Sequence, residues 1–141
     1  MTNEKKYREW LITIINPVDF GFSNERVREA MLSLSPIYWT ALNDCVKYVQ
    51  APHTSIYLVL ARPIIKDKLR DHFPNAQVES ADAPDHHHSS DLIRIIRGAI
   101  YDEVENRVLG GASDEEILID YPHYLHRLDG IRNAIEKFYF L

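Results

Sequence analysis

Apolar residues recur at every fourth position in the second half of this chain, at Leu92, Ile96, Ile100, Val104 and Val108. Because an α-helix turns once in 3.6 residues, this spacing places the five side chains along one face of a helix. Two glycines, Gly110 and Gly111, follow the pattern, and glycine commonly ends helices because it readily adopts left-handed backbone conformations. The spacing therefore predicts one long helix that ends at this glycine pair.

Two more helices are predicted after the glycines. Ser113 and Glu116 have the spacing of a capping box, which predicts a short helix up to Asp120. A last helix is predicted from about Pro122. Its apolar residues fall on one face, at Leu125, Leu128, Ile131, Ile135 and Phe138. Residues 91–141 are therefore expected to form a helical C-terminal region that packs as part of the same domain as the residues before it.

The first 80 residues contain a different pattern. Short segments rich in β-branched and aromatic residues alternate with proline and asparagine, which is typical of strands separated by turns. We expect strands at residues 8–15, 37–42, 54–61 and 76–80. Between them, Ser23 is suited to cap a helix that runs to about Leu34, and Pro63 stands near the start of a short helix at residues 64–72.

This order of elements predicts an α+β fold. Residues 1–90 are expected to form a sheet with helices, ending in a polar loop at residues 81–90. The length of 141 residues is typical of one domain. The single cysteine, Cys45, excludes a disulfide within the chain and is interpreted as a small buried residue.

Charge and hydropathy limit the functions that are open to the chain. A net charge of −5 argues against broad, nonspecific binding to nucleic acid, although it leaves room for a local basic patch. The N-terminus has no signal-peptide pattern, and no stretch approaches the roughly 18 apolar residues of a membrane helix. We expect a cytoplasmic protein of a bacterial cell, without a membrane partner.

Several segments, in this order and spacing, resemble one protein family. They are YREWLITIINPVDFGF at residues 7–22, IYW at 37–39, HTSIYL at 53–58, LRDHFPNA at 69–76 and GASDEEILIDYP at 111–122. Together they are similar to the rolling-circle replication initiators (Rep proteins) of Gram-positive plasmids and mobile elements, which are HUH endonucleases. The resemblance covers most of the chain.

The resemblance implies an antiparallel sheet flanked by helices. In the family, two histidines separated by one residue lie on a central strand and bind a divalent metal, and an acidic residue on the neighbouring strand often completes the site. The metal, Mn²⁺ or Mg²⁺, polarises the scissile phosphate. A tyrosine on a following helix attacks that phosphate and becomes linked to the 5′ side of the DNA.

Carried over to this chain, the family's site is incomplete. Thr13 matches the motif of the first strand, Asp44 falls where the family has its acidic ligand, and His53 matches the first histidine. Ser55 stands where the second histidine is expected. The register places Leu92 at the position of the family's nucleophilic tyrosine, and a deletion in this loop is the alternative. In either case, residues 85–93 contain no tyrosine. Tyr101 is the first tyrosine after them.

Each of these residues also has a simpler interpretation. His53 and Asp44 are either vestigial metal ligands, for weakly bound Mn²⁺ or Mg²⁺ if any metal binds, or ordinary polar residues at strand ends. Tyr101 is either a relocated nucleophile or a residue that flanks the packed face of its helix. The run of histidines at residues 86–88, beside Asp85, is either a metal site or an exposed loop.

Candidate nucleic-acid contacts combine cations with polar and aromatic side chains, as binding to phosphates and bases requires. They are Lys5, Lys6, Arg8, Thr13, Trp39, Tyr57, Arg62, Lys66 and Arg70. Lys68 belongs to the same basic group, and Trp10 and Tyr38 are further aromatic candidates. The alternative is a solvated charged face with aromatic residues in the core.

We interpret the chain as a degenerate Rep/HUH-like protein of a plasmid, phage or integrated element. It is predicted to bind a replication origin, hairpin or single strand without nicking it and without a required cofactor. One alternative is a protein inhibitor of a host defence nuclease, an anti-CRISPR-like protein whose carboxylates imitate phosphates. A second alternative is a residual metal-dependent nuclease that uses Asp44, His53 and Tyr101.

Overall fold

The computed structural model describes residues 5–44, 51–84 and 87–139. The chain divides into two compact units, Met1–Arg94 and Ile95–Leu141, and each is described by itself. The boundary lies inside helix α3, at Arg94, whereas the sequence suggests a change at residue 91. None of the helices in the described ranges is long and apolar enough to cross a membrane.

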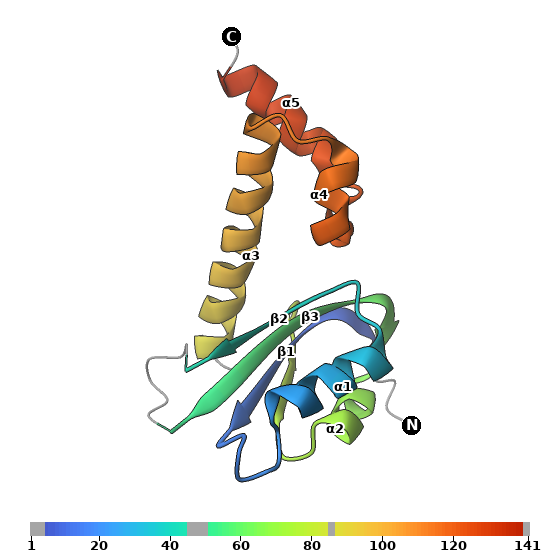
Figure 1. The fold of residues 1–141 in the computed structure, drawn as a ribbon, viewed down its shortest axis with the longest axis vertical. Coiled ribbons are helices and arrows are strands. Elements are labelled where there is room, and N and C mark those ends of the chain that lie inside the picture. Colours follow the sequence, from blue (N-terminus) through green and yellow to red (C-terminus); the bar gives the residue numbers. More distant parts are fainter. Residues whose placement is uncertain (1–4, 45–50, 85–86, 140–141) are drawn as a thin grey trace. The chain divides into compact units, whose positions relative to one another are not determined.

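The first unit contains one antiparallel sheet with the strand order β2-β3-β1-β4 (Figure 1). Its strands are β1 (Tyr7–Ile15), β2 (Tyr38–Asn43), β3 (His53–Ile64) and β4 (Gln77–Ser80). All four predicted strands are confirmed, as is the α+β fold class with flanking helices and a helical C-terminal region. The strand that begins at His53 is central, as expected.

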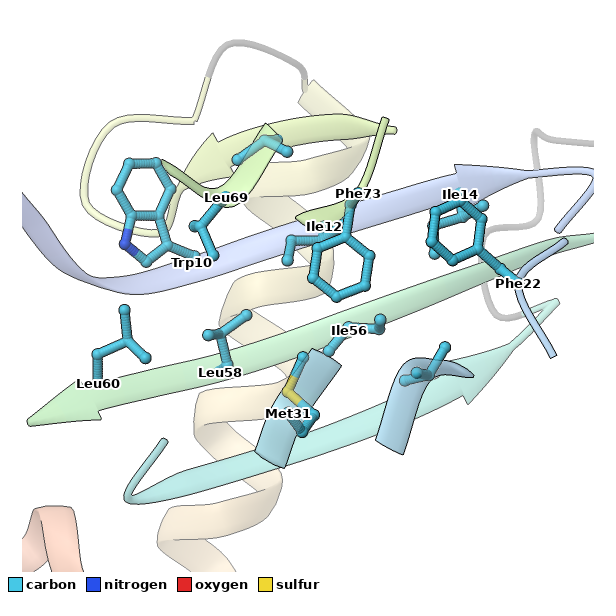
Figure 2. Close-up of a cluster of buried hydrophobic side chains, with 12 residues drawn as sticks. Trp10, Ile12, Ile14, Phe22, Met31, Ile56, Leu58, Leu60, Leu69 and Phe73 are labelled. Carbon is cyan, nitrogen blue, oxygen red and sulfur yellow. The ribbon is translucent and has the colours of Figure 1, made fainter. Parts of the chain in front are cut away.

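Two helices cover one face of this sheet, α1 (Asn24–Leu34) and α2 (Lys66–His72) (Figure 1). Alternate residues of the strands point to this face because successive side chains of a strand lie on opposite sides. Figure 2 shows the resulting core, in which Ile12 of β1 and Leu58 of β3 cluster with Met31 of α1 and Phe73 after α2. Phe22, which precedes α1, stacks on Phe73 with 5.8 Å between the ring centroids.

Helix α1 begins as the sequence predicts. The hydroxyl oxygen of Ser23 accepts a hydrogen bond from the backbone N–H of Arg26, at 3.2 Å. This bond satisfies one of the N–H groups that a helix leaves unpaired in its first turn.

Replacing Ser23 with alanine is expected to lower the free energy of unfolding by about 1 kcal/mol, because the first turn of α1 loses its cap. Urea denaturation followed by circular dichroism measures the change. Ser33 is the matched control, since it is exposed inside the same helix and caps nothing. Ser33→Ala should leave stability unchanged or slightly raised, because alanine is the better helix former. Equal losses in both variants would contradict the capping role.

The sequence misplaces the end of the third strand. The prediction ends it at residue 61 and begins a helix at residue 64, but β3 continues to Ile64 and α2 begins at Lys66. The register explains the difference, since Tyr7 pairs with Ile64 while Glu9 pairs with Val59. Pro63 therefore lies in an irregular part of the ladder, where a missing N–H group is tolerated.

The long helix starts earlier than predicted. Helix α3 spans His87–Leu109, so the predicted loop at residues 81–90 is wrong in its second half. The apolar pattern could not reveal the first turn because residues 87–91 are all polar. The end of α3 agrees with the prediction, and Gly111 has the left-handed φ of +87°.

The second unit contains the rest of α3, then α4 (Asp114–Asp120), a 3₁₀ turn η1 (Pro122–Tyr124) and α5 (Leu128–Tyr139). Ser113 caps α4 as predicted. The prediction of one helix from Pro122 is wrong, because the 3₁₀ turn precedes α5. On the predicted apolar face, Leu128, Ile131 and Ile135 are buried, but Leu125 is exposed. The side chain of Phe138 lies outside the described residues.

Ion pairs connect the helices of this unit. Arg132 of α5 donates to Asp114 at the start of α4, and Arg107 of α3 donates to Asp120 at its end, at 2.6 Å. The hydrogen bonds to Asp120 and Glu103 raise the pKa of Arg107 above its usual value. Burial, with a smaller contribution from Glu103, raises the pKa of Tyr121 beside it.

Candidate functional site

The face of the sheet opposite α1 and α2 carries a row of polar side chains. His53 and Ser55 both point to this face, since residues two apart on a strand share a side. Ser55 of β3 pairs with Thr13 of β1, and Thr13 pairs with Gln77 of β4. The structure thus brings Thr13 beside the position where the family's second histidine is expected.

Ser55 is fully buried, and its hydroxyl has no hydrogen-bond partner within the described part of the chain. A buried hydroxyl without a partner destabilises a fold, so such groups are uncommon and require an explanation. The expected likeness to the HUH family predicts one: Ser55 stands where that family has a metal-binding histidine, beside the polar Thr13.

His53 is also buried, and its Nδ1 atom lies 2.9 Å from the carbonyl oxygen of Ala51. In the neutral ring, Nδ1 then carries the proton and Nε2 carries the lone pair. Histidines that bind metals generally have this arrangement, in which the second nitrogen donates to a carbonyl or carboxylate. His53 shares this one feature with metal-binding histidines, namely an Nδ1 held by a backbone carbonyl.

Asp44 follows β2 and approaches His53 from the neighbouring strand, as the resemblance implies. Its Oδ1 atom accepts a hydrogen bond from the backbone N–H of His53 at 2.9 Å and lies 3.7 Å from His53 Nδ1. Asp44 has a left-handed φ of +53°, which aspartate tolerates better than most residues. Because the carboxylate faces Nδ1 and accepts a hydrogen bond from the backbone N–H of His53, its present contacts are structural.

Sequence reasoning missed the carboxylates Glu9 and Glu79 on this face. Glu79 is buried in β4 and accepts a hydrogen bond from Ser89 in the first turns of α3. Glu9 accepts one from the hydroxyl of Tyr57 at 2.5 Å. The alternation of polar and apolar residues in QVES at residues 77–80 could have indicated Glu79. Val78 lies in the core, so its neighbour Glu79 must point to the opposite face.

The histidine and carboxylates of this face do not form a metal site in the structure. Within the described ranges, no group of three or more histidine, cysteine or acidic side chains is placed to hold a metal ion. Asp85, His86 and Cys45 lie outside the described residues, as do the side chains of His87 and His88. Whether the chain binds Mn²⁺ or Mg²⁺ stays a prediction.

The candidate nucleophile Tyr101 belongs to the second unit. It is half-buried on α3 next to Ile100, whose side chain is buried. Leu92, at the register position of the family's tyrosine, is buried in the first unit. Neither placement provides a phenol beside His53 within the first unit.

The predicted basic residues are partly brought together. Lys5, Lys66 and Arg70 line one hollow of about 330 Å³ at the start of β1 and α2. Its other lining residues are Tyr7, Trp10, Asp67, Ser80 and Ala83. We call this site the basic hollow. Arg70 also pairs with Asp67 at 3.3 Å, and both side chains are exposed, so solvent weakens this pair.

The remaining candidates are distributed elsewhere. Lys6, Arg62 and Lys68 are exposed outside the basic hollow, and Arg8 donates to the carbonyl of Leu60 at 3.0 Å. Thr13 and Tyr57 are buried, so the fold does not present these two side chains to a nucleic acid, and their contacts with it stay a prediction. A buried ring presents no face to a base. Trp10 is buried too, and Trp39 and Tyr38 are half-buried.

A scan against protein-family models and a search of curated proteins give no match to this chain. The likeness to replication initiators therefore stays a prediction.

Proposed function

We propose that this chain is a degenerate Rep/HUH-like protein of a mobile element, and that it binds nucleic acid without nicking it. The observation that supports binding is the basic hollow, where Lys5 and Lys66 come from different segments of the chain and join Arg70. Cations that converge on one concave surface attract phosphates much more strongly than the same charges dispersed over the surface.

The distribution of charge also supports binding by the first unit. Residues 95–141 contain nine acidic and five basic side chains, whereas residues 1–94 contain twelve and eleven. Most of the net charge of −5 therefore belongs to the second unit. The first unit is close to neutral and can carry a local positive potential.

The absence of nicking is proposed from the chemistry of the polar face. Ser55 replaces a metal-binding imidazole, and the segment aligned with the nucleophile helix contains no tyrosine. A polarised phosphate without a nucleophile is not cleaved by this mechanism.

Binding can be tested with a fluorescently labelled 20-nucleotide single strand and a hairpin, followed by anisotropy from 50 to 200 mM salt. We expect the double variant K5Q/K66Q to reduce the slope of log affinity against log salt by about 1.4 on the single strand. This value corresponds to about 0.7 for each lost phosphate contact. The matched control is K6Q/K68Q, which removes the same charge from the neighbouring positions outside the basic hollow.

Equal effects of the two double variants would show that binding depends on overall charge, and would refute the basic hollow as the site. Absence of binding to both probes at 50 mM salt would refute the proposed function itself. Circular dichroism on each variant verifies that the fold is retained.

A second candidate function is inhibition of a defence nuclease by imitation of its nucleic acid. The observation that favours it is the acidic first turn of α4, where Asp114, Glu115 and Glu116 follow one another. Tight association with a CRISPR nuclease, weakened by E115Q/E116Q and without any DNA binding, would favour this candidate over the first.

A further inference from the structure

Two adjoining hollows lie between α1 and the edge strand β2, and both are lined by Arg28 and Trp39. The first, of about 340 Å³, reaches toward the end of β2 at Asn43. The second, of about 380 Å³, extends toward Leu32 and Pro36. Because they share two residues, we treat them as one groove and call it the Trp39 groove.

The side chains that line the Trp39 groove fit a nucleotide. Trp39 supplies an aromatic surface, Arg28 a cation, and Asn24 and Asn43 supply polar groups. Among the residues that the structure describes, none that lines either hollow carries a carboxylate. In a chain with 21 acidic residues, a groove with a cation and no acid favours an anionic occupant.

The indole is also held in place. Trp39 pairs with Leu58 of β3 and packs partly against the core, so one side of the ring is fixed while the residue remains half-exposed. A side chain that is already ordered loses little conformational entropy when a base stacks on it. Arg28 is exposed on α1 and lines both hollows, so its guanidinium can reach a phosphate next to that base.

We propose that the Trp39 groove binds one nucleotide of a single-stranded nucleic acid, with the base stacked on Trp39 and a phosphate paired with Arg28. This proposal rests on the proposed function and adds a second contact, separate from the basic hollow. The basic hollow attracts the backbone, and the Trp39 groove takes an unpaired base. The chain should therefore prefer single strands to duplexes.

The two tryptophans of the chain make the proposal testable by fluorescence. Trp10 is 2% exposed, so W10F leaves Trp39 as the single accessible indole. A base stacked on Trp39 should quench its emission, and we expect oligo(dT) to quench W10F in a saturable way. In W39F the remaining Trp10 should keep its emission. If W10F does not fold, ¹⁹F NMR of the 5-fluorotryptophan-labelled native sequence gives the same information, with the resonances assigned through W39F.

The role of Arg28 is tested by R28Q, which should reduce the salt slope on the single strand by about 0.7, one phosphate contact. Its control is R26Q, on the same helix, because Arg26 lies over the ring of Phe22 and does not line the groove. Replacing Trp39 by alanine should weaken binding roughly 5- to 100-fold.

The outcomes separate this proposal from the proposed function. DNA binding that depends on Lys5 and Lys66 but leaves Trp39 unquenched would overturn the nucleotide site and keep the proposed function. Failure to bind DNA at all would overturn both. A change in Trp39 emission with protein concentration, and none with DNA, would identify the groove as a contact between protein chains and overturn the proposal. Quenching together with the Arg28 effect supports it.

Discussion

Replacing Phe73 with alanine is expected to lower the free energy of unfolding by about 3–5 kcal/mol. Phe73 is 0% exposed and stacks on Phe22, which precedes α1, while its own backbone N–H caps α2 by donating to Leu69. The ring therefore joins both helices to the sheet (Figure 2). Its removal would leave a cavity between three elements that cannot all move inward together.

The matched control is Phe20→Ala, which removes the same side chain from a position that is 45% exposed. That variant should lose less than about 1 kcal/mol, because most surface substitutions have small effects. Urea denaturation measures both losses, provided that the dependence of the free energy of unfolding on urea concentration is the same in each variant. Similar losses in the two variants would contradict the central role of Phe73 in the core.

Replacing Ser55 with histidine is expected to strengthen divalent-metal binding over that of the native sequence. The introduced imidazole would lie beside His53 on the polar face, and the substitution removes a hydroxyl that has no partner in the described part of the chain. Two imidazoles on one face of the strand can bind Mn²⁺, and the Asp44 carboxylate, which now lies on the Nδ1 side of His53, would have to turn to become the third ligand. Calorimetry should show Mn²⁺ affinity at least about tenfold above that of the native sequence.

Thr54→His is the control for this substitution, because residue 54 points to the opposite face of the same strand. Adding Asp44→Asn to Ser55→His tests whether the carboxylate is the third ligand, since its loss should then weaken Mn²⁺ binding. DNA nicking should remain absent, because a metal supplies no nucleophile. A folded Ser55→His variant without metal affinity would show that the register against the family motif is wrong. A covalent DNA adduct that disappears in Tyr101→Phe would contradict the loss of nicking.

Local signals were sufficient for much of the fold. The caps at Ser23 and Ser113 depend on residues three positions apart, and the predicted strands follow from segments of five to eight residues. The errors arise where a boundary depends on distant partners. The start of α3 includes Ser89, whose bond to Glu79 is invisible in an apolar pattern, and β3 passes Pro63 because β1 pairs with it irregularly.

The candidate site was predicted less completely. Residues of one strand could be placed beside each other, as with His53 and Ser55, because strand geometry fixes their spacing. The sequence does not show which side of the sheet is covered. Tyr57 was therefore predicted as a nucleic-acid contact, although it is buried. Arg28 was missed because it joins Trp39 only after α1 packs beside β2.

The strand order has a consequence for how the chain folds during synthesis. β1 is made first, yet both of its sheet neighbours, β3 and β4, come later in the chain. β2 and β3 are adjacent in sequence and can pair early, because closing a short loop is fast. β1 therefore cannot pair in the sheet until β3 has left the ribosome. The sheet is complete only after residue 80 has been added. During that interval Ile12 and Ile14, which are buried in the folded chain, lack their sheet partners, so the nascent chain is more prone to aggregate.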